Sequence, residues 1–136
     1  MPYWLFKSEP DTWSWDQQVA KGAAGEEWHG VRNYQARNNM KAMNKGDLVF
    51  FYHSNIGRGI VGIMEIVREH YPDPTDERFV LVDVTCKRSF TKPVTLATIK
   101  SDPRLGNIAL IRQSRLSVMP ITSEEWDIIC DLGNAK

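Results

Sequence analysis

Few side chains in this sequence are spaced for catalysis. The three histidines, His29, His53 and His70, form no H-E-x-x-H pattern and stand beside no C-x-x-C pair, so the sequence predicts no metal site. Lys7 and Ser8 have the chemistry of a base and a nucleophile, but neighbours on a strand point to opposite faces. We therefore expect a protein that is not an enzyme and that uses no cofactor.

Binding chemistry is better represented, between positions 32 and 38. Two arginines, two asparagines, a glutamine and a tyrosine stand among these seven residues. Arg, Asn and Gln are the side chains that hydrogen-bond base edges and phosphates, although a solvated helix face has a similar composition. A second polar group, His53-Ser54-Asn55, follows an apolar run. Because polar side chains without partners are unfavourable in a core, we expect that run to end at the mouth of a pocket.

One of the five tryptophans stands apart from the others. Trp4, Trp13, Trp15 and Trp126 each have a plausible core position in an expected element. Trp28 lies instead in a polar stretch, residues 26–30. A tryptophan in such a place either caps the core or forms the stacking wall of a pocket for a flat ring.

Apolar periodicity predicts the elements that position these side chains. Ala36, Met40 and Met43 fall on one face of a helix over 33–45, and Thr122 with Glu125 has the spacing of a capping box before a final helix. The other expected elements are strands at 3–6, 48–53, 60–67, 79–86 and 116–119, and short helices at 11–20, 95–101 and 107–112; residues 21–30 and 71–75 are expected to be loop and turn. The order predicts an α+β fold whose short strands curl into a small barrel.

The charge balance is zero, with 17 basic and 17 acidic side chains among 136 residues. A zero balance argues against a uniformly basic nucleic-acid-binding protein and against a polybasic membrane-surface protein. The charges are segregated, however. Residues 32–45 hold four basic and no acidic side chains, and residues 86–115 hold seven and one. A basic rim for nucleic acid is therefore expected only if these two blocks share one face of the fold.

Cellular context follows from absent segments. No apolar run approaches the roughly 18 residues of a membrane span, and the first residues do not resemble a signal peptide. Two distant cysteines, Cys86 and Cys130, suggest reduced thiols and no disulfide framework. We expect one domain over residues 1–136, no membrane partner, and a cytoplasmic protein, or a nuclear one if the source is eukaryotic.

Many ordered segments, spanning about residues 2–132, resemble the EVE domain family. They are residues 3–10 (YWLFKSEP), 28–38 (WHGVRNYQARN), 46–47 (GD), 51–55 (FYHSN), 59–62 (GIVG), 71–75 (YPDPT), 93–96 (PVTL) with 99–100 (IK), and 115–118 (RLSV). The resemblance implies a PUA-like mixed β-barrel of about five to six strands with short peripheral helices. It also implies a non-catalytic reader that flips a modified base, chiefly modified cytosine in DNA, into a pocket.

Site residues are suggested by the resemblance together with the polar segments described above. Those expected in the base pocket are Trp28, Lys7, Ser8, Asn33, Tyr34, Tyr52, Ser54 and Asn55; those expected to hold the phosphate backbone are Arg32, Arg37, Lys41, Arg112 and Arg115. The resemblance itself covers Lys7, Ser8, Trp28, Ser54 and Asn55 in the pocket and Arg112 and Arg115 at the backbone. The related YTH readers of methylated adenine in RNA have a second cage tryptophan, for which Tyr71 is only a loose candidate here.

Alternatives remain open at this point. The expected partner is a nucleic acid carrying a modified base, or a small heterocyclic ligand if the protein is a sensor that binds no nucleic acid. A base-processing enzyme is the third reading. The base, its modification, DNA against RNA, and the oligomeric state have no signature in the sequence.

Overall fold

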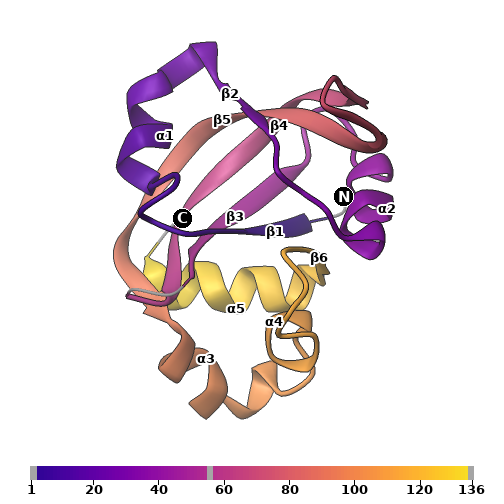
Figure 1. Ribbon diagram of the computed structural model, residues 1–136. Coiled ribbons are helices and arrows are strands. Elements are labelled where there is room, and N and C mark those ends of the chain that lie inside the picture. The colour runs from indigo at the N-terminus through magenta and orange to yellow at the C-terminus, as the bar shows by residue number, and fades with distance from the viewer. Residues whose placement is uncertain (1–2, 55–56, 135–136) are drawn as a thin grey trace.

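Six strands form one mixed sheet around which the helices are arranged (Figure 1). The computed structural model describes residues 3–54 and 57–134. The strands are β1 (Tyr3–Ser8), β2 (Glu26–Trp28), β3 (Leu48–His53), β4 (Gly59–Asp73), β5 (Asp76–Thr95) and β6 (Val118–Ile121). Their order in the sheet is β2-β5-β4-β3-β1-β6, with β1 and β3 parallel and the other neighbours antiparallel. The expected α+β fold with five to six strands is confirmed.

Five α-helices and two 3-10 turns complete the described chain. They are α1 (Trp15–Lys21), η1 (Gly22–Ala24), α2 (Tyr34–Lys41), α3 (Leu96–Ser101), η2 (Pro103–Leu105), α4 (Ala109–Arg112) and α5 (Ser123–Gly133). Figure 1 shows α1 at the left and α2 at the right of the sheet, and α3, α4 and α5 below it. The capping box expected at the start of α5 is present, with Thr122 and Glu125 each bonded to the other's backbone N–H.

The hairpin of β4 and β5 is much longer than the apolar pattern predicts. Residues 71–75 were expected to form a turn, yet β4 continues to Asp73 and the turn is confined to Pro74-Thr75. The pairing of the two strands slips at five places, including one on either side of Pro72. Irregular pairing of this kind leaves residues without a ladder partner and bends a strand, so that proline and polar residues are accommodated.

The sheet curls until its edge strand β2 faces strands far from it in the sheet order. The Trp28 ring of β2 lies 5.0 Å from the ring of Phe6 on β1 and 5.7 Å from that of Phe51 on β3. Strands β5 and β4 lie between β2 and β3 in the sheet. A flat sheet would keep these rings well apart, because neighbouring strands are about 4.8 Å apart. The contact therefore reflects barrel-like curvature.

The two faces of β3 serve different neighbours. Phe50 stacks on Trp126 of α5 at 3.8 Å between ring centroids, whereas Phe51, the next residue, faces Trp28 and Trp15. Adjacent residues on a strand point to opposite faces, so α5 covers one side of the sheet and the aromatic cluster of Trp15, Trp28 and Phe51 fills the other.

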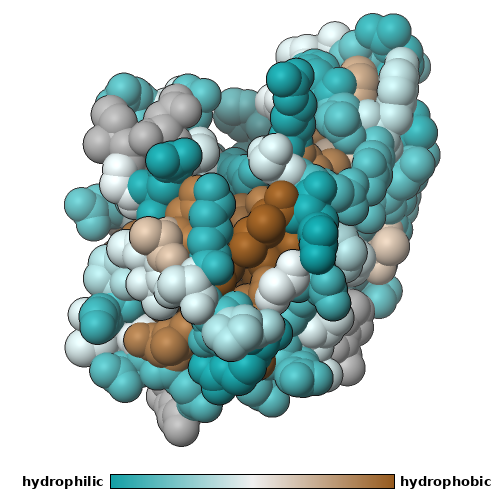
Figure 2. Space-filling model, turned by 90° about the horizontal axis from the view of Figure 1, so that it is seen from below, coloured by the Kyte–Doolittle hydropathy of each residue, from teal (hydrophilic) through white to brown (hydrophobic). Residues whose placement is uncertain are grey.

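Hydrophobic side chains also reach part of the surface, as Figure 2 shows. Seen from below, hydrophobic residues occupy a hollow near the middle of the face and hydrophilic side chains frame it (Figure 2). Among residues 3–54 and 57–134, no helix is long and apolar enough to cross a membrane.

Helix α1 is seated on the sheet by a tryptophan lying against a glycine. A Cβ placed on Gly62 would come within 2.2 Å of the Trp15 ring, so only glycine leaves room for this contact. Trp15 also donates its indole N–H to Ser89 at 2.9 Å, and its backbone N–H to His53 Nε2 at 3.0 Å. These contacts fix α1, and with it the residues just before the helix.

We expect Gly62→Ala to lower the free energy of unfolding by about 1–3 kcal/mol, because the new methyl group overpacks the Trp15 contact. Gly106→Ala is the matched control, since its Cβ would make only an ordinary 3.5 Å contact. Its effect should stay within about 0.5 kcal/mol. Urea denaturation measures both, and equal effects of the two substitutions would show that the contact does not limit packing.

Candidate functional site

A pocket of about 310 Å³ opens where β1 ends beside β2. Its lining comes from the end of β1, the segment before α1, β2 and the two residues after it: Lys7, Ser8, Glu9, Thr12, Trp13, Glu26, Glu27, Trp28, His29 and Gly30. We call it the β1–β2 pocket. Pockets of about 300 Å³ are at the small end of those that hold organic ligands, which suits one or two rings.

Three of the residues expected in a base pocket meet here. Lys7 and Ser8 are the last residues of β1, and Trp28 is the last residue of β2. Trp28 is only 8% exposed, because its ring packs on Phe6 and Phe51. It therefore packs in the core and also lines the pocket, and its role as a stacking wall stays a prediction.

The pocket has a second tryptophan that sequence reasoning assigned to the core. Trp13 lies before the N-cap residue Ser14, outside α1, and it lines the pocket. The Ser8 hydroxyl donates to its backbone carbonyl at 2.5 Å, and its indole N–H donates to Gln18 at 2.9 Å. Gln18 is fully buried and donates in turn to the carbonyl of Val84. The signal that could have found Trp13 is the S-W-D-Q capping box, which starts α1 one residue after it.

Tyr71 has a different position from the one considered for it. It is not among the lining residues; its hydroxyl donates to Asp83 at 2.5 Å and lies 3.4 Å from Glu27, which does line the pocket. The Arg68 guanidinium covers its ring at 3.8 Å. Burial, together with the bond to the Asp83 carboxylate, raises the pKa of Tyr71, so the phenol keeps its proton and acts as a donor. Tyr71 therefore contacts Glu27 of the pocket lining without lining the pocket itself.

The chemical character of the lining is mixed. Glu9, Glu26 and Glu27 supply carboxylate acceptors, and Lys7 supplies an ammonium donor. One proton of Lys7 is donated to the carbonyl of Ser114 at 2.7 Å, and burial lowers the pKa of Lys7. A ligand with an amino group on one edge and a carbonyl oxygen on another would find partners for both.

Lys7 and Ser8 do not form a base and nucleophile pair. The Ser8 hydroxyl donates to Trp13 and the Lys7 ammonium to Ser114, so each is committed to a backbone carbonyl. Nucleophilic catalysis needs the two side chains within hydrogen-bonding reach of each other. Among the described residues, no group of three or more His, Cys, Asp or Glu side chains could hold a metal ion.

The other residues expected in the base pocket lie elsewhere. Asn33 caps α2 by accepting from Ala36 N–H at 2.9 Å, as Asn and Asp do where helices begin. Tyr34 is on the surface of α2, and Tyr52 is 3% exposed in the core, where burial raises its pKa. The backbone N–H of Ser54 donates to the carbonyl of Ser8 at the end of β1 at 2.9 Å. Asn55 falls outside the described residues.

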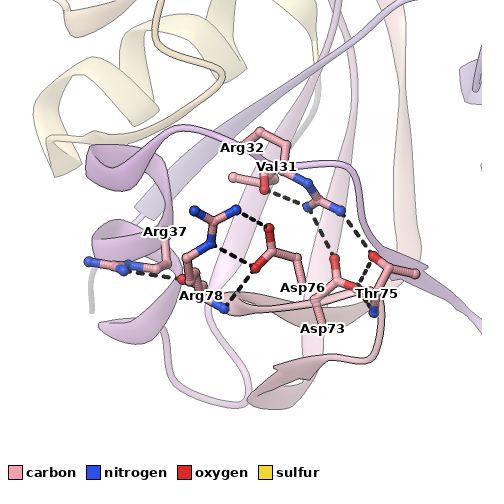
Figure 3. Close-up of polar contacts among 7 residues, drawn as sticks. All are labelled: Val31, Arg32, Arg37, Asp73, Thr75, Asp76 and Arg78. Atoms are coloured by element: carbon pink, nitrogen blue, oxygen red, sulfur yellow. Dashed lines mark hydrogen bonds and ion pairs between the residues drawn. The ribbon is translucent and has the colours of Figure 1, made fainter.

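Three of the expected phosphate-holding arginines, Arg32, Arg37 and Arg112, are engaged with protein oxygens. Arg32 pairs with the buried carboxylate of Asp73 at 3.1 Å and donates to Thr75 (Figure 3). Two hydrogen bonds from Thr75 hold the pKa of Asp73 below its usual range, and Arg32 contributes as well. Arg112 donates to Asn107 at 3.1 Å. Lys41 and Arg115 are exposed.

Only part of the two basic blocks shares a face. Gln35 on α2 donates to Gln113 at 2.7 Å, and Asn39 donates to the carbonyl of Val118 at 2.8 Å, so residues 112–115 lie beside α2. Lys7 ties the same segment to the β1–β2 pocket. Lys87 and Arg88 line a different hollow, against Trp126 of α5, on the other side of the sheet. The expected rim is thus limited to α2 and residues 112–115.

Comparisons with known proteins agree with this geometry. The family model of the EVE domain matches residues 2–132. The chain belongs to the EVE domain family. Thymocyte nuclear protein 1 of Mus musculus is 37% identical over 98% of this chain and 74% of its own length. The fold and the family that the sequence suggested are therefore confirmed.

Solved EVE domains superimpose closely on this one. Rpa0253 from Rhodopseudomonas palustris is 58% identical with a TM-score of 0.94, covering 98% of this chain and 94% of its own. Human THYN1 in complex with 5-methylcytosine containing DNA is 33% identical with a TM-score of 0.92, covering 100% and 99%. The YTH domain of Zygosaccharomyces rouxii MRB1 shares the fold alone, at 15% identity and a TM-score of 0.60 over 98% of this chain and 87% of its own.

Acid should loosen the site through His53. Its Nε2 accepts from the Trp15 backbone, which requires the neutral ring; burial lowers the pKa of His53, and the Asp16 charge opposes part of that shift. A histidine whose pKa is lower in the folded than in the unfolded state destabilises the fold when protonated. We expect the free energy of unfolding to be level above about pH 6.5 and to fall below it, by about 1 kcal/mol for one lost hydrogen bond.

The measurement is urea denaturation between pH 5 and 7.5. His53→Gln keeps a side-chain oxygen as an acceptor and should flatten this part of the pH profile. His70→Gln, at an exposed position, is the control and should leave the profile unchanged. The same acid slope in the wild type and in His53→Gln would contradict the assignment.

Proposed function

We propose that this EVE domain is a non-catalytic reader that binds a modified nucleobase flipped into the β1–β2 pocket, with modified cytosine in DNA as the preferred ligand. The observation that carries the proposal is the pair of tryptophans, Trp13 and Trp28, on a pocket sized for one or two rings. Human THYN1, of the same family and fold, binds DNA that contains 5-methylcytosine. A binding assay must compare DNA with RNA, because the proposal allows a modified base in either.

Base recognition in this pocket combines stacking with edge contacts. Stacking of a base on an aromatic side chain contributes about 1–3 kcal/mol. This contribution offsets the few kcal/mol needed to flip the base, and that cost is lowest in a single strand. The amino group of cytosine donates to a carboxylate of Glu26 or Glu27, and the ring carbonyl accepts from Lys7. A methyl group at C5 adds apolar surface against the indole rings.

Phosphate contacts supply affinity without sequence information. Arg37, Lys41 and Arg115 hold the backbone, because they lie on α2 and the adjoining segment that Lys7 ties to the pocket. Arg32 has a positioning role, since its guanidinium group pairs with the buried carboxylate of Asp73.

A sensor for a small heterocycle is the second candidate. It is favoured by the three glutamates of the lining, which repel phosphate and would suit a free base or nucleoside. The dependence of affinity on salt separates the two, because each phosphate contact steepens it and a neutral nucleoside has none.

The chain is proposed to act as one domain over residues 1–136, in the cytoplasm, or in the nucleus if the source is eukaryotic. Support for the nuclear case is the name of the curated relatives, thymocyte nuclear protein 1. The family match over residues 2–132 supports the single domain.

We expect Trp13→Ala to weaken binding of a single-stranded oligonucleotide carrying one 5-methylcytosine by about tenfold, as the loss of one stacking wall predicts. Trp13→Phe should retain most of the affinity. Trp13 is a better position than Trp28, whose ring also packs on Phe6 and Phe51. Calorimetric titration of modified and unmodified strands gives the result, and equal affinity for both strands in the wild type and in Trp13→Ala would exclude the pocket.

Salt should weaken binding of the oligonucleotide and leave binding of the free nucleoside unchanged. With three phosphate contacts on a single strand, log K is expected to fall with log salt at a slope of about −2, and Arg115→Ala should reduce that slope by about 0.7. Lys100→Ala, an exposed basic position on α3, is the matched control. Titrations between 50 and 300 mM salt measure the slopes, and a flat oligonucleotide profile would favour the small-ligand sensor.

A further inference from the structure

The surface of α2 beside the β1–β2 pocket carries an exposed aromatic ring surrounded by arginines. Tyr34 is 52% exposed, although its ring stacks on the buried Phe79 with the centroids 5.3 Å apart and the planes 17° apart. The Arg37 guanidinium lies 4.8 Å from the Tyr34 ring centroid, and that of Arg78 lies 5.9 Å from the Phe79 centroid. We call these four residues, Tyr34, Arg37, Arg78 and Phe79, the arginine–aromatic patch.

The solvent-facing stripe of α2 has one sign of charge. Tyr34, Arg37, Asn38 and Lys41 follow a helical spacing of three and four residues and therefore share a face, whereas Ala36 and Met40 are buried on the other. The helix contains no acidic residue. This composition is unlike an ordinary solvated helix face, in which both signs alternate.

Among the described residues, the hydrogen-bond partners of the Arg37 guanidinium are uncharged, so they do not neutralise its positive charge. Its guanidinium donates to the backbone carbonyl of Arg78 at 3.1 Å and to the side-chain oxygen of Asn38 at 2.9 Å, both uncharged. Arg78, by contrast, is paired in two places with the carboxylate of Asp76. Arg37 is therefore the cation of the patch that can take an anionic partner without first breaking an ion pair.

The patch is held at a fixed position relative to the pocket. Gly30 lines the pocket and Tyr34 follows it by four residues, so the two are at most about 14 Å apart along the chain. Between them, Arg32 clamps the connection to Asp73 and Thr75 on the β4–β5 turn, as Figure 3 shows. Even a fully stacked strand advances about 3.4 Å per nucleotide, so about four nucleotides cover this distance.

We infer that the arginine–aromatic patch is a second nucleotide-binding surface, on which a base within about four nucleotides of the flipped one stacks against Tyr34 and Arg37, while Arg37 and Lys41 hold the neighbouring phosphates. The chemistry favours single-stranded nucleic acid, because aromatic rings and guanidinium planes are the groups on which unstacked bases rest. The inference depends on the proposed function, since it assigns the path of the strand that leaves the pocket.

The experiment compares two ligands that differ only in what the patch would touch. One is the nucleoside 5-methyl-2′-deoxycytidine; the other is a single-stranded DNA nine-mer with 5-methylcytosine at its centre. Tyr34→Ala should weaken binding of the nine-mer about tenfold and change nucleoside binding by less than twofold. Tyr34→Phe keeps the stacking ring and should behave as the wild type, and unchanged nucleoside binding shows that each variant is folded.

Charge is tested separately. Arg37→Ala should reduce the salt slope of nine-mer binding by about 0.7, as loss of one phosphate contact predicts. Arg104→Ala is the control, because Arg104 is an exposed arginine on η2, which directly follows α3, and α3 lies below the sheet and away from α2 in Figure 1.

Outcomes of the two ligands separate the two claims. If the wild type binds the nine-mer no more tightly than the nucleoside, or if Tyr34→Ala weakens both equally, the second surface is excluded and the pocket stands. If the wild type binds neither ligand, the proposed function fails and the second surface with it. If Tyr34→Ala does not fold, Arg37→Ala decides alone, and an unchanged salt slope would overturn the inference.

Discussion

The candidate site depends on the seating of one edge-strand tryptophan on the far side of its own sheet. Trp28 of β2 rests on Phe6 and Phe51, although β2 is separated from β1 and β3 by the long hairpin of β4 and β5. The repeated slips in the pairing of that hairpin give the sheet the curvature that the contact needs. The curvature of the sheet therefore brings β2 against β1 and β3 and in doing so forms a wall of the pocket. No additional element is needed to build that wall.

The pocket is organised in advance by hydrogen bonds within the protein. Ser8 and Gln18 hold Trp13, while Lys7 anchors the segment around Ser114 that lies against α2. Side chains fixed in this way lose little conformational freedom on binding, so more of the stacking energy appears as affinity. The same bonds occupy Lys7 and Ser8, so these two side chains do not form a nucleophile and base pair.

Several features were predictable because they are local. The capping box of α5 and the apolar face of α2 follow from spacing, and the strand at residues 3–6 follows from its apolar run. Trp28 was expected in the pocket from its polar surroundings and, together with Lys7 and Ser8, from the family resemblance. The extent of β4 and β5 was not, because irregular pairing has no period. For Trp13, the capping box places the residue before α1, but it does not distinguish a pocket tryptophan from a core tryptophan. Asn33 and Arg32 illustrate a further limit: residue types suited to bases are equally suited to capping a helix and to pairing with a buried carboxylate. The zero net charge, likewise, hides a basic α2 beside a glutamate-lined pocket.

The most direct test of the account observes the indole N–H groups of the five tryptophans by NMR while 5-methyl-2′-deoxycytidine is added. Trp13 and Trp28 line the pocket, whereas Trp4 is bonded to Asp47 and Trp126 of α5 stacks on Phe50 on the other face of the sheet. The account predicts that the Trp13 and Trp28 signals shift as the nucleoside binds and that those of Trp4 and Trp126 stay in place. Binding that leaves the Trp13 and Trp28 signals unmoved, or no binding at all, would contradict it.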